Sequence, residues 1–335
     1  MSLLVRRPGL LTTVQDRGRF GLQHLGVVPS GAMDPVALEL ANGLVGNRGD
    51  EAALELTVLG PELEFRSEAL VALCGAPFEA RLDGRPLPLD RPVLVRSGSV
   101  LAARRATRGA RAYLAVAGGI AAAPVLGSRS TFLPARFGGF EGRALRSGDV
   151  LDLTENCSAI SLERFERLDQ RRKMSGIETV PWSAPALTAP EHEPIVIHAM
   201  EGRHRDAFDT ASQRAFFEAT WKVSPDSNRM GFRLAGPVLA RAESAEILSE
   251  PTCLGTVQVP ANGLPIALMA DHQTTGGYPK IAEIASADVP RLAQLAPGGA
   301  LRFARCTLEQ AQELRRALRR RVAAALRAVA WAYGQ

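Results

Sequence analysis

The sequence predicts a mainly β protein with two β-barrel domains, a few helices and a basic amphipathic helix at its C-terminal end. Three observations support this prediction. Most of the chain consists of short apolar runs separated by turn residues, and both halves contain a strand, then a glycine-rich loop, then a closing strand. Residues 307–335 follow a helical pattern instead.

Strands are predicted where short apolar runs stand between turn signals such as LDGRP at 82–86 and SGD at 147–149. The runs in the first part of the chain are Leu54–Leu59, Ala69–Cys74, Val93–Arg96, Ala112–Val116 and Val150–Leu153. Many short strands with frequent turns are typical of a barrel or a sandwich.

One helix interrupts these strands. Asp34 is suited to the N-cap, Pro35 to the first helical position, and apolar residues follow at steps of four as far as Gly46, a plausible stop. Asp34 is also a candidate site acid, and the sequence leaves both roles open.

The order of parts in the two halves suggests two copies of one β-fold. Strand Ala112–Val116 leads into AGGIAAAPVLGSRST, and strand Pro265–Ala270 leads into DHQTTGGYP. A charged stretch followed by several prolines separates the halves. We therefore expect a first β-barrel domain at 1–155, a connecting segment at 156–193, a second β-barrel domain at 194–306 and a C-terminal helix at 307–335.

The C-terminal helix has one apolar face and many arginines between the apolar positions. The apolar residues recur at steps of three or four: Leu314, Leu318, Val322, Leu326, Val329 and Tyr333. Such a face can pack on its own domain or on a partner protein, and a basic amphipathic helix can also lie on an anionic membrane.

Charge and cysteine content exclude several classes of protein. The net charge of +5 comes mainly from residues 307–335, which hold six arginines and two glutamates. A nucleic-acid-binding protein would instead show a basic stripe on its folded domains. The four cysteines are isolated, the histidines lack metal-ligand spacing, and no apolar run is long enough to span a bilayer. We expect no metal site and a cytoplasmic protein.

Two polar clusters in the first half are candidate binding residues. Asp16 and Arg17 could bind a carboxylate or carbamoyl group, or pair with neighbours. Ser128, Arg129 and Ser130 follow a glycine and could bind an anion through side chains and backbone N–H groups, or form a polar turn whose hydrogen bonds are satisfied within its own domain. The GxxxxGK[ST] phosphate loop is missing, so ATP binding by this chain is not supported.

Two clusters in the second half are candidate site residues. Arg229, within SNRMG, could hold a substrate carboxylate or form a structural ion pair. Asp271, His272, Thr274 and Thr275 directly follow an apolar strand, where a site on a β-scaffold is expected. We predict that the backbone freedom of two glycines, 276 and 277, lets Asp271, His272 and Thr274 face one pocket together with Arg229. The alternative is a tight turn with ordinary hydrogen bonds.

These clusters, in this order, resemble the family of allophanate hydrolase subunit 2. This family includes the C-type subunit of 5-oxoprolinase, the KipI antagonist KipA, and part of the biotin-dependent carboxyltransferase region of urea carboxylase. The matching stretches are TTVQDRGRFG, GVVPSGAMD, LANGLVGN, LELTVLGPELEF, YLAVAGGI, VLGSRST, SNRMGFRL, SEPTCLGTVQVP and DHQTTGGYP. Asn228 stands where the family usually has an acid, which removes one potential proton carrier from its loop.

The resemblance implies cyclophilin-like β-barrels and a role in a complex. It implies ATP-dependent opening of 5-oxo-L-proline to L-glutamate, together with two partners, a KipI-like protein and a LamB/YcsF-like protein. The alternatives are the carboxyltransferase component of a urea carboxylase or allophanate hydrolase-like system, and a KipA-like regulatory protein that antagonises a kinase inhibitor. The resemblance further implies that the complex uses ATP, that this chain binds no cofactor, and that any biotin is carried by a partner.

Overall fold

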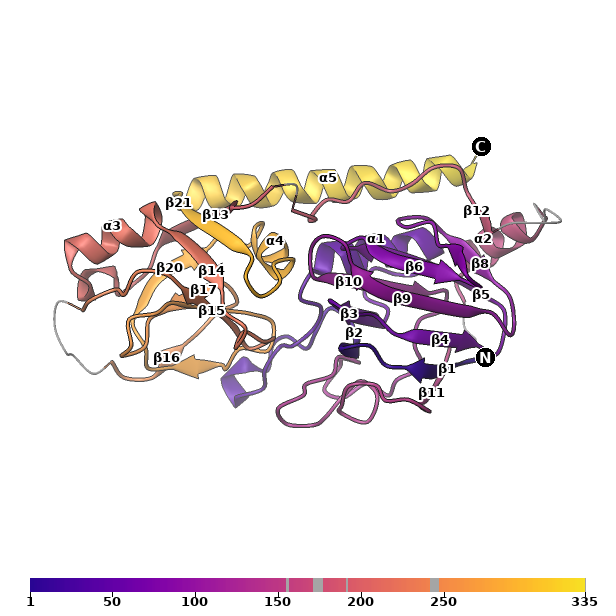
Figure 1. The fold of residues 1–335 in the computed structure, drawn as a ribbon, viewed down its shortest axis with the longest axis horizontal. Helices are drawn as coiled ribbons and strands as arrows, with labels where there is room; N and C mark the ends of the chain where they lie inside the picture. The colour runs from indigo at the N-terminus through magenta and orange to yellow at the C-terminus, as the bar shows by residue number, and fades with distance from the viewer. Residues whose placement is uncertain (155–156, 171–176, 191, 242–246, 335) are drawn as a thin grey trace. The chain divides into compact units, whose positions relative to one another are not determined.

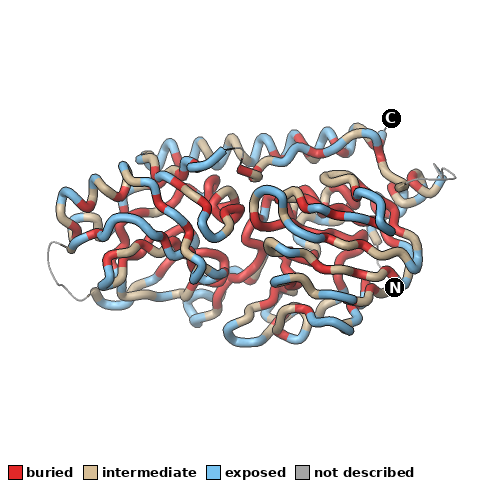
Figure 2. The backbone as a smooth tube through the Cα atoms, in the orientation of Figure 1, coloured by how far each residue is buried: buried red, intermediate tan, exposed pale blue. Residues whose placement is uncertain are grey.

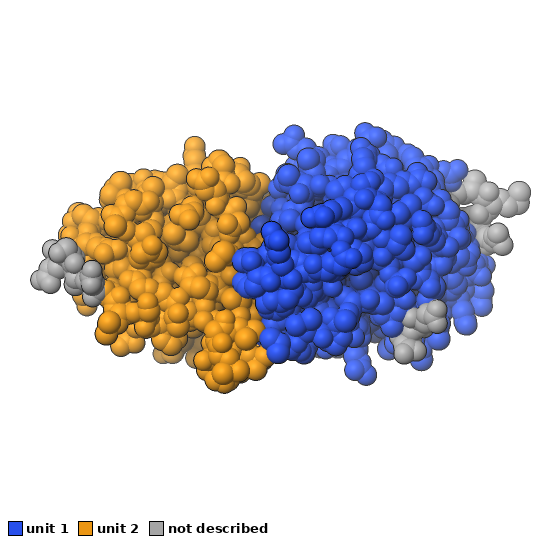
Figure 3. Space-filling model, turned by 90° about the horizontal axis from the view of Figure 1, so that it is seen from below, with its two compact units in different colours: residues 1–19, 34–189, 321–335 blue, residues 20–33, 190–320 orange. Residues whose placement is uncertain are grey.

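The computed structural model describes residues 1–154, 157–170, 177–190, 192–241 and 247–334. Figure 1 shows strands throughout most of the chain and a long helix at its C-terminal end. The described residues form two compact units. Unit 1 contains residues 1–19, 34–189 and 321–335, and unit 2 contains residues 20–33 and 190–320; they are blue and orange in Figure 3. The predicted mainly β fold with few helices is confirmed.

Unit 1 is built from two six-stranded sheets. The first, in spatial order, contains β11 (Val150–Asp152), β1 (Ser2–Arg7), β4 (Glu62–Phe65), β9 (Val100–Ala106), β6 (Phe78–Leu82) and β7 (Arg85–Pro86). The second contains β12 (Glu178–Thr179), β8 (Val93–Val95), β5 (Ala69–Gly75), β10 (Arg111–Val116), β3 (Ala53–Thr57) and β2 (Leu11–Gln15). Apolar residues of both sheets, such as Leu3, Phe65, Val71 and Leu114, form one core.

The helix predicted after residue 34 is present as α1 (Pro35–Val45). The Asp34 carboxylate accepts hydrogen bonds from the backbone N–H groups of Val36 and Ala37, so Asp34 is the N-cap. Gly46 ends the helix with a φ of 81°. Helix α1 packs against β5 and β10, which explains why both of these strands are buried almost throughout.

Unit 2 contains a closed seven-stranded barrel. The strands follow one another around it as β13 (Ile195–Glu201), β20 (Lys280–Ile284), β17 (Thr256–Gln258), β18 (Ile266–Leu268), β15 (Gly231–Ala235), β14 (Thr220–Val223) and β21 (Ala300–Arg305). Two short strands, β16 (Glu250–Pro251) and β19 (Thr275–Gly276), pair beside it. The core includes Trp221, Phe216 and Phe303, and Figure 2 shows buried backbone in the interior of each unit.

The remaining helices are α2 (Ala159–Gln170), α3 (Thr210–Glu218), α4 (Val289–Ala293) and α5 (Leu308–Gly334). Among the described residues, none of the helices combines the length and the apolar character needed to cross a membrane.

The second part of α5 packs on unit 1 of its own chain. Val322, Val329 and Tyr333 are buried, and the Leu326 side chain lies where a Cβ on Gly43 of α1 would stand. The Arg164 guanidinium of α2 lies 4.3 Å from the centre of the Tyr333 ring. The sequence leaves three alternatives open for the apolar face of this helix: its own domain, a partner protein or a membrane. Residues 321–334 pack on their own domain.

A charge on this face should destabilise unit 1. Val322→Asp places a carboxylate at a side chain that is 1% exposed, and we expect a loss of at least about 3 kcal/mol in the free energy of unfolding. Ala323→Asp changes the next residue, which is exposed, and should lower the free energy of unfolding by less than about 1 kcal/mol. Urea unfolding of both variants checks this, and equal losses would contradict the packing described.

Candidate functional site

The residues predicted from the sequence fall into two groups, one in each unit. Unit 1 holds Asp16, Arg17, Ser128, Arg129 and Ser130. Unit 2 holds Arg229, Asp271, His272, Thr274 and Thr275.

In unit 1 the Asp16 carboxylate is buried at the centre of a hydrogen-bond cluster. Its Oδ1 accepts from the hydroxyls of Ser128 at 2.6 Å and Ser130 at 2.5 Å, and from the Gly18 N–H at 2.8 Å. Its Oδ2 accepts from the backbone N–H of Arg129 at 2.5 Å. The structure thus brings two separate sequence motifs together, with Asp16 holding the turn at 128–130.

The two arginines of this group lie at its edge. Arg17 is about half exposed, and its guanidinium is 3.3 Å from the Glu39 carboxylate. Arg129 is partly buried and donates from Nε to the Ala122 carbonyl at 3.0 Å. The four hydrogen bonds to the Asp16 carboxylate given above therefore involve neither arginine side chain.

In unit 2 the strand register brings Arg229 and Asp271 together. Strands β15 and β18 are antiparallel, with Gly231 opposite Leu268. Arg229 precedes the first strand and Asp271 follows the second, so both lie at the same end of the pair. The Asp271 N–H donates to the Arg229 carbonyl at 2.8 Å, which extends the pairing to these two residues.

Arg229 and Asp271 form a buried ion pair. Their side chains are 4% and 1% exposed, with Nε to Oδ2 at 3.0 Å and Nη2 to Oδ1 at 3.2 Å. The segment at 20–33 completes the arrangement. The Ser30 hydroxyl donates to Asp271 Oδ1 at 2.7 Å, and Arg229 also donates to the Gly31 carbonyl. The sequence leaves two roles open for Arg229, binding a substrate carboxylate or forming a structural ion pair. The structure shows the ion pair.

His272 is buried beside this pair. Its Nδ1 lies 2.7 Å from the Gln273 carbonyl oxygen, which can only accept a hydrogen bond. Nδ1 must therefore carry the proton, which leaves the Nε2 lone pair available. Burial lowers the pKa of His272, although the Gln273 carbonyl and the Asp271 charge oppose this effect. The imidazole is therefore neutral at neutral pH and suited to accept a proton.

Thr274 and Thr275 follow in a segment that is partly strand. The Thr274 carbonyl accepts from the Thr252 N–H at 3.0 Å, and Thr275 pairs with Pro251 in β16. Within the described part of the chain, neither threonine hydroxyl makes a hydrogen bond to a side chain or to the backbone. Both are hence available to a ligand.

The predicted role of the two glycines in this loop is wrong. Neither Gly276 nor Gly277 has the positive φ that only glycine adopts readily. Space is the constraint at Gly276, because a Cβ there would lie 2.7 Å from Gln258 Nε2 and 3.2 Å from Gln273 Nε2. The glycine lets the loop approach these two amides closely.

The structure adds an ionic cluster that the sequence analysis does not predict. Lys280 is buried, and its Nζ lies 2.8 Å from Glu250 Oε1. The same carboxylate is 3.2 Å from Arg203 and 3.6 Å from His204 Nε2. Lys280 directly follows the DHQTTGGYP motif, which is the local sequence signal that points to it. Glu250 and Arg203 come from distant segments that no local pattern connects.

A second carboxyl group lies near this cluster. Glu283 accepts a hydrogen bond from the Thr256 hydroxyl at 2.7 Å. Burial raises the pKa of Glu283, while the Thr256 hydrogen bond and the Lys280 charge lower it. Strands β17 and β20 of the barrel supply both residues. Unit 2 thus contains a neutral imidazole, hydroxyls and carboxyl groups that are buried or partly buried, the residue types that transfer protons and stabilise an oxyanion.

Three comparisons with known proteins agree with one another. The chain is 42% identical to the C-type subunit of 5-oxoprolinase from Escherichia coli over 93% of this chain and 94% of that protein. It is 38% identical to the corresponding 5-oxoprolinase subunit of Haemophilus influenzae over 91% of each chain. The solved structure of the urea amidolyase of K. lactis matches with a TM-score of 0.85 and 32% identity, over 97% of this chain and 20% of that chain.

The family model described as "Carboxyltransferase domain, subdomain A and B" matches residues 25–305. This match includes all of the predicted site residues except Asp16 and Arg17, and it confirms the resemblance found in the sequence motifs. The chain belongs to this carboxyltransferase-domain family.

Proposed function

We propose that this chain is one component of an ATP-dependent 5-oxoprolinase, which opens 5-oxo-L-proline to L-glutamate, and that it is active only with its partner proteins. The observation that carries the proposal is the 42% identity to the C-type 5-oxoprolinase subunit of E. coli, which extends over nearly the whole of both chains. The match leaves no large part of either chain that would require a different function.

The side chains of His272, Thr274 and Thr275 in unit 2 have the chemistry that this reaction needs. Opening a lactam requires proton transfer and stabilisation of a developing oxyanion. In this proposal His272 Nε2 accepts a proton from the water that attacks the lactam carbonyl and returns it to the ring nitrogen as the C–N bond breaks. The hydroxyls of Thr274 and Thr275 donate to the oxyanion. Asp271 holds His272 in place by anchoring its loop to Arg229, so Arg229 acts through Asp271.

The group in unit 1 has a supporting role in this proposal. Asp16, Ser128 and Ser130 are bound to one another and hold the turn at 128–130. Arg17 and Arg129 are the members of the group that we propose for binding an anion within unit 1, since guanidinium groups bind carboxylates well.

The cofactor and the partners follow from the same proposal. The chain lacks a phosphate-binding loop of the GxxxxGK[ST] type, so the complex uses ATP through another of its proteins. The partners are a KipI-like protein and a LamB/YcsF-like protein. The location of the complex is the cytoplasm.

A second candidate function is carboxyl transfer in a urea carboxylase-like system. It is favoured by the family model, which is named for a carboxyltransferase domain, and by the match to the K. lactis urea amidolyase. This chain corresponds to 20% of that protein, so the function would require several further domains. Any biotin would then be carried by a partner.

A comparison of substrates distinguishes the two functions. The chain is purified with its KipI-like and LamB/YcsF-like partners, and ATP hydrolysis is measured with 5-oxo-L-proline or with urea and bicarbonate. We expect stimulation by 5-oxo-L-proline only, and no ATP binding by the isolated chain in calorimetry. Stimulation by urea alone, or tight ATP binding by the isolated chain, would overturn the proposal.

A further inference from the structure

Thr252 binds two successive carbonyl groups of the loop that carries His272. It directly follows strand β16 and is 9% exposed. Its hydroxyl donates to the Gln273 carbonyl oxygen, which can only accept a hydrogen bond. Its backbone N–H donates to the Thr274 carbonyl at 3.0 Å. One residue therefore fixes the direction of the peptide groups on either side of Thr274.

The same contacts determine which nitrogen of His272 carries a proton. Nδ1 lies 2.7 Å from the Gln273 carbonyl oxygen and 3.4 Å from the Thr252 hydroxyl oxygen. The hydroxyl proton is engaged in the bond to Gln273, so both oxygens present lone pairs to Nδ1. A protonated Nδ1 is attracted by both oxygens, whereas an unprotonated Nδ1 would meet lone pairs only. The geometry therefore stabilises the tautomer in which Nε2 is free.

Thr252 is itself held in place through strand β16. This strand pairs with β19, where Pro251 lies opposite Thr275. The Lys280 side chain is buried, and its ammonium group donates to the Pro251 carbonyl and lies 2.8 Å from the Glu250 carboxylate. Both residues that precede Thr252 are thus anchored to one ammonium group. This anchoring limits the movement of the Thr252 hydroxyl relative to the loop.

We propose that Thr252 is a positioning residue for the candidate base, because its hydroxyl keeps His272 in the tautomer whose Nε2 accepts a proton. The proposal rests on the proposed function, in which His272 takes a proton from the attacking water. Thr252 touches no reacting atom and acts through the Gln273 carbonyl. Its removal should still affect turnover strongly, since a displacement of about 1 Å at a catalytic group can lower the rate about 10²-fold.

Two substitutions separate the hydroxyl of Thr252 from the shape of its side chain. Thr252→Val keeps the shape and removes the hydroxyl, whereas Thr252→Ser keeps the hydroxyl and removes the methyl group. In the valine variant the Gln273 carbonyl still accepts from His272 Nδ1, so it is not left unpaired. We expect the valine variant to lower kcat of the assembled complex about 10–100-fold, with KM changed less than about twofold. The serine variant should stay within about threefold of the wild type.

Nitrogen NMR of the isolated full chain measures the tautomer without an enzymatic assay. The chain has five histidines, and the His272 signals are identified by their absence in His272→Asn. At neutral pH we expect one tautomer, with an unprotonated Nε2, in the wild type and in Thr252→Ser. Thr252→Val should add the tautomer with a proton on Nε2.

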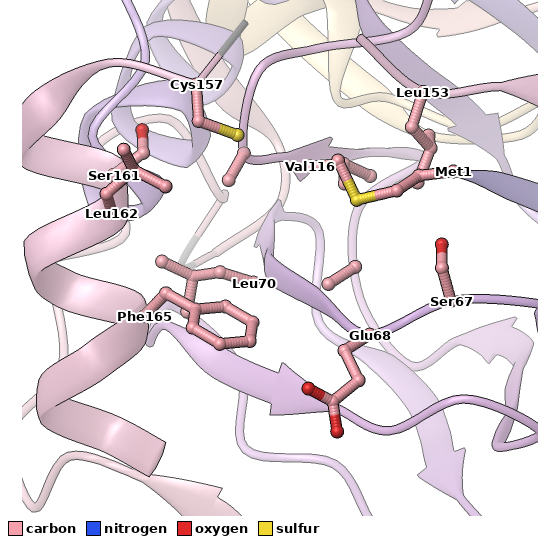
Figure 4. A pocket seen from close by; sticks show the side chains of 12 residues that line it. Met1, Ser67, Glu68, Leu70, Val116, Leu153, Cys157, Ser161, Leu162 and Phe165 are labelled. Carbon is pink, nitrogen blue, oxygen red and sulfur yellow. The ribbon is translucent and has the colours of Figure 1, made fainter. Parts of the chain in front are cut away.

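A buried hydroxyl in unit 1 provides the control. Ser161 of α2 is 1% exposed, and its hydroxyl lies 3.0 Å from that of Ser158. It lines an apolar pocket of about 320 Å³ (Figure 4), and none of the residues around this pocket belongs to β16 or to the loop at 271–275. Ser161→Ala should therefore leave both kcat and the tautomer of His272 unchanged.

The role of Thr252 is supported if Thr252→Val lowers kcat and adds the second tautomer while Thr252→Ser does neither. A single tautomer in Thr252→Val, or unchanged kcat in its correctly assembled complex, would overturn the proposal. Equal losses in Thr252→Ser or Ser161→Ala would overturn it too, because the hydroxyl at 252 would then not be the cause. If the wild-type complex converts no 5-oxo-L-proline, the proposed function fails, and the tautomer alone decides the role of Thr252.

Discussion

Replacing His272 by asparagine is expected to lower the turnover of the assembled complex by about 10²–10⁴-fold, the usual contribution of a general acid–base group. The asparagine amide can still donate to the Gln273 carbonyl, which His272 Nδ1 approaches to 2.7 Å in the native chain. The substitution therefore removes mainly the Nε2 lone pair. The loss of rate would report on proton transfer rather than on the position of the loop.

A matched control is available in the same unit. His192 is exposed, and His192→Asn should leave turnover unchanged. Both variants are assayed as purified complexes, so that a failure of assembly is not mistaken for a chemical defect. Near-full turnover by a correctly assembled His272→Asn complex would show that this imidazole transfers no proton in the reaction.

The pH dependence provides a separate check on the same residue. A general base must be neutral, and burial lowers the pKa of His272. Activity is therefore present above that pKa and is lost as the pH falls through it. The acidic limb of kcat/KM should lie below about pH 6.5, the ordinary value for histidine.

Replacing Asp271 by alanine is expected to destabilise unit 2 by about 3–5 kcal/mol, because it leaves the Arg229 charge buried without its carboxylate partner. Arg229 is 4% exposed, so water cannot hydrate the guanidinium without local opening. The double variant Arg229→Met/Asp271→Leu removes both charges and should regain much of this loss. Urea unfolding of the full chain measures both effects.

An exposed ion pair serves as the comparison. Arg6 and Glu64 in unit 1 are 46% and 26% exposed, and Glu64→Ala should cost no more than about 1 kcal/mol. If Asp271→Ala costs as little as Glu64→Ala, the buried pair does not hold the loop at 271–275. The positioning role that we propose for Asp271 and Arg229 would then be wrong.

The buried strands of this protein are predictable from sequence because they are continuous apolar runs. Strands β5 and β10 lie between the core and α1, so nearly every residue in them is apolar. Strands β6 and β9 are harder to predict. Both strands contain exposed polar residues. The sequences FEARL of β6 and VLAARRA of β9 therefore lack a continuous apolar run.

The candidate site is predictable only as far as its local motifs extend. The loop composition indicates Asp271 and His272, because polar residues follow an apolar strand directly. The partner of Arg229 cannot be read from the sequence, since the two residues of the pair are 42 positions apart and meet through the register of β15 and β18. The contact of Ser30 with Asp271 spans 241 positions and depends entirely on tertiary structure.

The most direct test of the proposed function is whether 5-oxo-L-proline conversion requires this chain. Glutamate formation is measured with ATP and the KipI-like and LamB/YcsF-like partners, with and without the chain. We predict ATP-dependent glutamate formation only when the wild-type chain is present. The same rate without the chain, or no glutamate from the complete and correctly assembled complex, would contradict the proposed function.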